Sequence, residues 1–456
     1  MSTRTLIKGG QVLSMDRDIG DLPSGDVLIE DGVIAAVLPE ISADAEVIDA
    51  SGMIVTPGFI DTHRHTWEAA IRGCAPNATL DDYFVEVLDS FAPHYRPQDV
   101  YASNLAGALE CLNAGITTLV DWSHINNTPE HPDAAIRALR ETGIRAQYAY
   151  GSANTSLADY WFDSKIAIPG DDVRRVRETY FSSDSADGLL TMALATRGTG
   201  FCVDDVVRAE WALARELDIP ITVHVAMGRL AGRFGMIKQL HELGLLGPDT
   251  TYIHCCYFSE EEWRLVADSG GTISVAPQVE VQMGHGWPPV MKAIEHGLRP
   301  GLSIDVVTTV PGDMFTQIRS AFGTERARVN SECWQANVDI PENMLTARDM
   351  LEMATVNGAH VAGLEGRTGS LTPGKRADVV LLDATALNMA PVIDPVAAVT
   401  LCADVSNVDT VLVDGVVRKR GGKLLADVAA ARAGVEAASS YLVDQVAQHK
   451  ATAPAS

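Results

Sequence analysis

Short apolar runs alternate with amphipathic segments through the middle of the chain, from about residue 57 to residue 305. Eight of these runs are candidate strands: residues 58–60, 117–121, 145–150, 190–195, 220–225, 251–255, 272–275 and 299–305. Apolar strands that alternate with amphipathic helices are typical of parallel βαβ units. Because eight such units close a barrel, the pattern predicts an α/β fold, a (β/α)8 TIM barrel over residues 57–365.

A different pattern, of short strands and tight turns, occupies both ends of the chain. It covers residues 5–13, 26–30, 33–37 and 47–48, and it returns at residues 369–383 and 408–418. Neither piece alone has enough strands to be stable. We therefore predict one small β-sandwich-like module built from residues 1–56 and 366–425, followed by a C-terminal helix and tail over residues 426–456.

The charge and the cysteines of the chain limit which partners and which compartment we expect for it. Sixty acidic residues against 35 basic ones give a formal charge of −25, which repels nucleic acid and anionic membrane surfaces. The first residues lead straight into a strand pattern, without the apolar segment of a secretion signal. The seven cysteines are an odd number without paired spacing, which indicates reduced thiols. We expect a cytoplasmic protein that acts on a small molecule and binds neither nucleic acid nor membranes.

Candidate metal ligands follow the apolar runs. His63 and His65 stand two residues apart after the first run, and a period of two puts both imidazoles on one side of a strand. His224, His254 and Asp305 end three later runs. Barrel enzymes place their sites at the C-terminal ends of the strands, so these side chains are expected to converge there. Imidazoles and carboxylates are ligands of divalent metal ions such as zinc.

These residues carry a resemblance to a known family. The matching motifs are Thr-Pro-Gly-Phe-Ile-Asp-Thr-His-Arg-His at residues 56–65, the strand-end His224, Ile253-His254-Cys255, Asp305 and the stretch 369–378. Together they resemble the amidohydrolase superfamily, and within it the branch that contains cytosine deaminase, guanine deaminase and the triazine hydrolases. The resemblance covers the whole chain, including the split module.

The resemblance implies a ligand set and two catalytic roles. One divalent ion, zinc first and iron as the alternative, would be bound by His63, His65, His224 and Asp305. Binuclear relatives bridge two metals with a lysine on the fourth strand, and the run 190–196 holds no lysine, so one ion per chain is expected. Asp305 would act as general base, and His254 would orient the attacking hydroxide.

The chain departs from that branch at one position. Its members usually carry a proton-shuttling glutamate three residues after the strand-five histidine, where this chain has Met227. In one interpretation Met227 packs against the substrate and Asp305 handles every proton. In the other, Glu280 or His285, which follow the seventh run, contacts the substrate and replaces the missing acid. Trp122, after the second run, is a candidate aromatic wall of the pocket.

The function predicted from these residues is deamination of a nitrogen heterocycle of the purine, pyrimidine or triazine kind by an activated water. The alternative is hydrolytic displacement of chloride, an amine or a thiol, or hydrolysis of a urea, carbamate or cyclic amide. A non-catalytic scaffold is disfavoured, because five buried polar groups without a metal would be costly. Relatives commonly associate, so a homo-oligomer is also expected.

Overall fold

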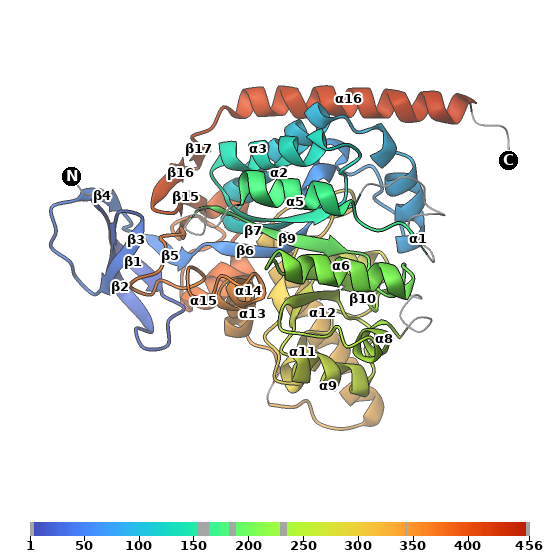
Figure 1. Ribbon diagram of the computed structural model, residues 1–456. Coiled ribbons are helices and arrows are strands. Elements are labelled where there is room, and N and C mark those ends of the chain that lie inside the picture. The colour runs from blue at the N-terminus through green and yellow to red at the C-terminus, as the bar shows by residue number, and fades with distance from the viewer. Residues whose placement is uncertain (1–3, 153–163, 182–187, 229–234, 343, 453–456) are drawn as a thin grey trace.

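Eight parallel strands form the central barrel of the protein. The computed structural model describes residues 4–152, 164–181, 188–228, 235–342 and 344–452. The strands follow one another around the barrel in chain order (Figure 1). Their bounds are β6 Phe59–Arg64, β7 Ile116–Ser123, β8 Arg145–Gly151, β9 Leu190–Thr196, β10 Ile221–Val225, β11 Thr250–His254, β12 Thr272–Val275 and β13 Gly301–Leu302. The predicted fold is confirmed.

The first and last strands meet through residues that also carry candidate ligands. The amide of Asp305 donates to the carbonyl of His63 at 3.0 Å, and the amide of His65 donates to the carbonyl of Asp305 at 2.9 Å. Strand β13 covers only Gly301–Leu302 of the predicted run 299–305, and Asp305, beyond its end, has a left-handed φ of 67°. Closing the barrel therefore fixes the register between the two ends of the candidate ligand set.

Helices surround the barrel. They are α2 Pro97–Asn113, α3 Glu130–Thr142, α5 Gly170–Tyr180, α6 Asp204–Glu216, α8 Met236–Glu242, α9 Glu260–Ser269, α10 Pro277–Gln282, α11 Val290–Glu295, α12 Met314–Ala336, α13 Ala347–Ala354 and α14 Val356–Val361. Helix α6 buries Val207, Trp211 and Ala214 on one face. A capping box starts α9, since Ser259 and Glu262 each accept the other's amide hydrogen.

Shorter helices complete the connections: η1 Thr66–Ile71, α1 Leu80–Tyr83, η2 Phe84–Asp89, η3 Ala92–His94, α15 Pro395–Ala397, η6 Ala398–Cys402 and η7 Val405–Asn407. Helix α16, Val428–Thr452, runs along the outside of the barrel over α2 (Figure 1). The Arg96 guanidinium lies 3.4 Å from the ring centre of Tyr441, and this cation–π contact helps to hold α16 against the barrel. Within the described residues, no helix is both long and apolar enough to span a membrane.

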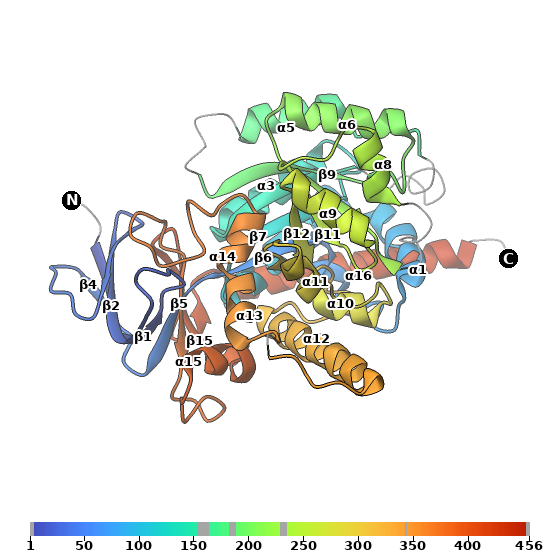
Figure 2. The ribbon, with the colours of Figure 1, turned by 90° about the horizontal axis from the view of Figure 1, so that it is seen from below.

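Both ends of the chain build a second, separate sheet beside the barrel (Figure 2). Its strands are β1 Arg4–Leu13, β2 Asp21–Glu30, β3 Val33–Leu38, β4 Glu46–Asp49, β5 Met53–Pro57, β14 Val379–Asp383, β15 Val408–Val413, β16 Val416–Arg420 and β17 Lys423–Leu424. Strand β14 pairs antiparallel with β5 and joins the two terminal pieces into one hydrogen-bonded sheet. The predicted composite module is thus confirmed as a sheet of terminal strands, while its exact boundaries stay a prediction.

Candidate metal centre and active site

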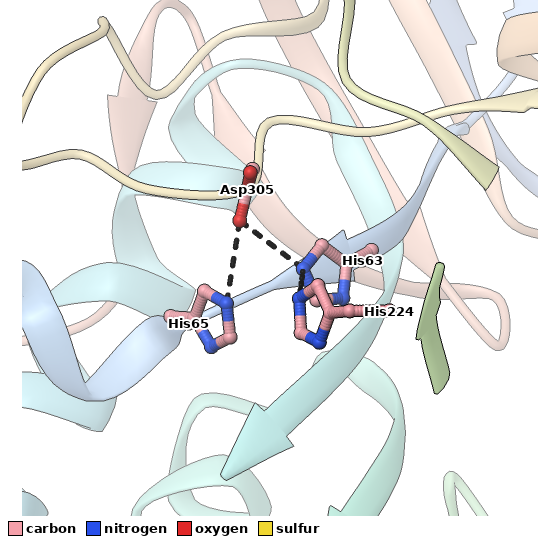
Figure 3. A group of neighbouring side chains, drawn as sticks. All are labelled: His63, His65, His224 and Asp305. Carbon is pink, nitrogen blue, oxygen red and sulfur yellow. Dashed lines mark hydrogen bonds and ion pairs between the residues drawn. The ribbon is translucent and has the colours of Figure 1, made fainter. Parts of the chain in front are cut away.

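Four buried side chains converge at the C-terminal end of the barrel: His63, His65, His224 and Asp305 (Figure 3). The Nε2 atoms of His63 and His65 lie 3.1 and 3.3 Å from Asp305 Oδ1. The Nε2 atoms of His224 and His63 lie 3.2 Å apart. Zinc bonds of about 2.0–2.1 Å in a tetrahedron put neighbouring ligand atoms about 3.4 Å apart. The spacing of these four side chains therefore suits one small divalent ion.

Hydrogen bonds select which nitrogen of the ligand histidines faces the centre. His65 Nδ1 lies 3.0 Å from the carbonyl oxygen of Trp122, which can only accept, so Nδ1 carries the hydrogen and Nε2 offers its lone pair. Two imidazole nitrogens facing each other, as those of His63 and His224 do, share one hydrogen at most. A bound cation satisfies both lone pairs, and the donor set fits a metal ion for this reason.

The electrostatics of the cluster favour the ligand forms of His63, His224 and Asp305. For His65, burial would lower the pKa, but its hydrogen bond to Asp305 raises that pKa above the ordinary value. Burial lowers the pKa of His63 to about 4. Burial and the neighbouring histidines lower the pKa of His224 well below its ordinary value. Burial alone would raise the pKa of Asp305, but its hydrogen bonds with His63 and His65 bring it well below the ordinary value. Two neutral imidazoles and an ionised carboxylate are thus presented together near neutral pH.

His254 lies beside this cluster and is held from behind by Glu280. The Glu280 Oε1 atom accepts the Ala276 amide hydrogen at 2.8 Å and lies 3.2 Å from His254 Nδ1. Since that oxygen acts as an acceptor, His254 Nδ1 carries a hydrogen and its Nε2 faces Asp305 Oδ2 at 3.7 Å. His254 and Asp305 also have left-handed φ values of 74° and 67°, a strained backbone that concentrates at functional sites.

A cavity that is open to solvent lies over the cluster. Its lining includes the candidate ligands His65, His224 and Asp305, together with His254. The apolar part of its wall comprises Leu80, Phe84, Leu88, Met227, Met283 and Val306, and the remaining lining residues are Tyr83, His124 and His285. The structure thus places Met227 and His285, two of the predicted substrate contacts, in the lining of the cavity, and their contact with a substrate stays a prediction.

Trp122 and Glu280, the two other predicted substrate contacts, lie behind the residues that line the cavity. The Trp122 ring packs edge-on against His65 and His224, with ring centres 5.3 and 4.4 Å apart, and is 1% exposed. Glu280 is fully buried and hydrogen-bonded to His254. Among the described residues, neither belongs to the cavity lining. This placement supports a role in orienting the histidines and gives no support to the substrate contact predicted for each.

The sequence reasoning missed Glu68, a fully buried acid three residues after His65. Its carboxylate accepts hydrogen bonds from the hydroxyls of Tyr83 and, at 3.3 Å, Thr308. Burial raises the pKa of Glu68 to about 7. Its place one turn beyond the paired histidines is the signal that could have found it.

Residues 54–418 match the amidohydrolase family. The chain belongs to this family. It is 27% identical over 419 residues to a 5'-deoxyadenosine deaminase of Methanosarcina mazei, with 90% of this chain and 91% of the relative covered. It is 29% identical over 427 residues to a 5-methylthioadenosine/S-adenosylhomocysteine deaminase of Desulforamulus reducens, with 90% and 92% covered.

Solved structures show the same fold. An adenosine deaminase from Xanthomonas campestris with bound zinc superposes with a TM-score of 0.83 at 22% identity, covering 97% of this chain and 99% of that one. Atrazine chlorohydrolase from Arthrobacter aurescens, complexed with zinc, superposes with a TM-score of 0.83 at 24% identity, covering 95% and 100%. The predicted family is confirmed, and this amidohydrolase is a hydrolase that acts on carbon–nitrogen bonds.

Proposed function

We propose that this amidohydrolase removes an amino group from a purine-like nitrogen heterocycle by hydrolysis and releases ammonia. The observation that carries the proposal is the convergence of His63, His65, His224 and Asp305 at the floor of a cavity, with His254 beside them. The two curated relatives named above are deaminases of adenine-containing molecules, which supports the same reaction here.

The proposed metal is one zinc ion per chain, held by His63, His65, His224 and Asp305. When bound, a divalent ion at such a site lowers the pKa of a water molecule toward neutrality. Strand β9 holds no lysine that could bridge a second ion in the way of binuclear relatives. The zinc-bound relatives of the same fold support zinc over iron.

Two side chains would handle the attacking water. Asp305 Oδ1 faces two of the ligand histidines and Oδ2 faces His254, so Oδ2 is placed to accept a proton from the water. His254 presents its Nε2 toward the same place, because its Nδ1 is held by Glu280. His254 would thereby orient the water toward the substrate carbon, while Asp305 passes the proton to the departing amine.

The alternative is displacement of another leaving group by the same water. Met227 in place of the usual acid favours it, because a leaving group such as chloride needs no proton. The test therefore also measures the release of other leaving groups and the hydrolysis of ring and amide bonds.

Elemental analysis of the purified protein, together with ammonia release from purines, adenine nucleosides, pyrimidines and triazines, tests the proposal. We expect about one zinc per chain and ammonia release that disappears in His224→Ala. A zinc-loaded enzyme that releases chloride or an alkylamine but no ammonia would favour the alternative. A wild-type protein that binds no metal would contradict both.

We also propose a cytoplasmic homo-oligomer, because all seven cysteines are free thiols, as is usual in a reducing compartment, and because members of the family commonly associate. Sedimentation of the purified protein tests the subunit number. A monomer at micromolar concentration would contradict that part of the proposal.

A further inference from the structure

His285 lies in a loop whose shape is fixed by its backbone. The loop joins α10 to α11, and the His285 carbonyl accepts a hydrogen bond from the Gly228 amide at 2.7 Å, which ties it to the end of β10. The next residue, Gly286, donates its amide to the carbonyl of Glu280 at 3.1 Å. Its φ of 138° suits only glycine, and a Cβ there would lie 2.7 Å from the Cys256 Cβ. These contacts fix the backbone position from which the His285 side chain extends.

The His285 side chain is buried without a hydrogen-bond partner. It is 2% exposed and lines the cavity, yet neither ring nitrogen is paired among the described residues. An unpaired buried polar group costs about 1–3 kcal/mol, so such groups are usually completed by something that binds. Burial lowers the pKa of His285 to about 3, which leaves a neutral ring with one N–H donor and one acceptor.

The His285 ring lies close to His254 and Asp305, the two side chains that would handle the attacking water. One polar atom each of His254, His285 and Asp305 lie within 4.8 Å of one another. With hydrogen bonds of about 2.7–3.2 Å, one small polar atom can reach two of them at once. The His285 ring also packs edge-on against His254, with centres 4.7 Å apart. A ring nitrogen next to the attacked carbon would therefore lie within reach of His285.

Other polar groups near the cavity already have hydrogen-bond partners within the protein. Tyr83 donates its hydroxyl to Glu68, and His124 Nδ1 accepts the indole hydrogen of Trp67 at 3.3 Å. Glu280 Oε1 is engaged by Ala276 and His254. Met227, at the place of the usual acid, offers only a thioether. Among the cavity-lining residues that the structure describes, and apart from the metal cluster and His254, His285 is thus the one whose polar atoms are left for the substrate.

We propose that His285 donates a hydrogen bond to the ring nitrogen adjacent to the attacked carbon, and so takes over the substrate-activating task that Met227 cannot perform. The inference rests on the proposed deamination. It also narrows the substrate to an uncharged, planar heterocycle with an unsubstituted nitrogen beside the amino-bearing carbon. Phe84, Met227 and Met283 provide apolar surfaces for the faces of such a ring.

The chemistry balances with His285 keeping its proton. As the water oxygen bonds to the carbon, the π electrons of the C=N bond move onto the ring nitrogen, where the His285 N–H stabilises them. Asp305 takes one proton from the water and passes it to the amino group. The nitrogen lone pair then re-forms the C=N bond, the bond to the amine breaks, and ammonia leaves with its electron pair. One water is consumed and a hydroxyl-bearing ring remains.

Three variants test this role in the zinc-loaded enzyme. Removal of one hydrogen-bond donor to a developing charge lowers kcat by about 10²–10³, and we expect a loss of this size in His285→Ala with unchanged zinc content. His285→Gln keeps an N–H donor and should retain a larger share of kcat. Adding Met227→Glu to His285→Ala should restore part of the lost activity, because it supplies a donor at the usual position.

His131→Ala is the matched control. His131 is another buried histidine, bonded to Thr128 and to the Tyr95 carbonyl, and it lies outside the described cavity lining. Its loss should lower the unfolding temperature without changing kcat per folded molecule. A kcat and KM of His285→Ala within about twofold of wild type would overturn the proposal, because no hydrogen-bond donor of use to the reaction would have been lost.

A failure of deamination itself is distinguishable. If the wild type releases no ammonia from any substrate, calorimetry with unsubstituted purine still tests the contact. We expect binding about tenfold weaker in His285→Ala, equivalent to about 1.4 kcal/mol. Equal binding by both proteins, or none by the wild type, would overturn the assignment of His285.

Discussion

Among the described residues, buried polar groups are paired at one end of the barrel and some lack partners at the other. At the start of β8, Arg145 is 2% exposed and pairs with Asp378 at 2.7 Å and with Asp414 at 3.2 Å. At the opposite end, His63 and His224 face each other at 3.2 Å and His285 has no described partner. The paired charges connect the barrel to the terminal sheet, whereas the unpaired nitrogens lie where we propose that a metal and a substrate bind.

Left-handed backbone occurs at both ends, because Asp414, the partner of Arg145, has a φ of 56°. His254 and Asp305 have left-handed φ values at the cavity end. Arg145 continues a regular strand at the other end and connects the barrel to the terminal sheet. The two ends therefore differ in the pairing of their buried side chains rather than in backbone strain. Substitutions at the two ends should separate activity from stability.

The largest expected effect is on activity. His224→Ala removes one ligand from the centre, and we expect ammonia release to fall by about 10³-fold or more, because the activated water is lost. The free energy of unfolding of the metal-free protein should change little or increase, since one of two opposed imidazoles is gone. Initial-rate assays and urea titrations of the same samples check both parts. Retained activity in the variant would remove His224 from the ligand set.

The next effect is on stability. Asp378→Ala leaves Arg145 buried with only Asp414 as a charged partner, and we expect a loss of about 3–5 kcal/mol in the free energy of unfolding. The kcat per folded molecule should stay within about twofold of wild type, since the ion pair lies at the opposite end from the cavity. Urea denaturation and active-site titration measure the two quantities. A large fall in kcat without a loss of stability would contradict the division between the two ends.

A smaller effect is expected from Glu280→Gln, which weakens the support of His254 without touching the cavity lining. Loss of an orienting partner of this kind lowers activity by about 10–100-fold. Zinc content and KM should be unchanged, because the substitution leaves the ligands and the wall intact. Steady-state kinetics at several pH values separate this positioning role from a structural one. A change in KM alone would instead place Glu280 in contact with the substrate.

The smallest effect concerns pH. Metal binding requires neutral imidazoles, and burial lowers the pKa of His63 to about 4 and that of His224 well below the ordinary value. Burial would also lower the pKa of His65, but its hydrogen bond to Asp305 raises that pKa above the ordinary value, so near neutral pH protons compete with the metal at His65 alone. We expect zinc to be retained below pH 6.5, the ordinary pKa of histidine. Zinc content after dialysis between pH 8 and pH 4 checks this, and half-loss at or above pH 6.5 would contradict it.

The barrel and the convergence of the candidate ligands could be predicted from the sequence because each ligand follows an apolar strand. Residues at equivalent strand ends of a barrel face one centre, so local spacing contains the necessary information. The paired histidines after β6 and Asp305 after β13 are brought together by the first and last strands. The split sheet was equally predictable, because both ends carry incomplete strand sets.

Contacts between loops could not be predicted in the same way. The segment after β12 forms the short helix α10, which turns Glu280 toward His254 and leaves His285 to face the cavity. A linear pattern does not show that turn, so the sequence left the two residues as equal alternatives. Glu68 was missed for a related reason, because its partners Tyr83 and Thr308 come from distant parts of the chain.

X-ray absorption at the zinc edge of the zinc-loaded enzyme tests the central claim most directly. The account predicts about four nitrogen or oxygen ligands near 2.0–2.1 Å, with the multiple-scattering signature of three imidazoles and no sulfur. The chain has seven free thiols, two of which, Cys255 and Cys256, follow His254 directly. A sulfur ligand at about 2.3 Å, or a shell without imidazoles, would contradict the assignment of His63, His65, His224 and Asp305.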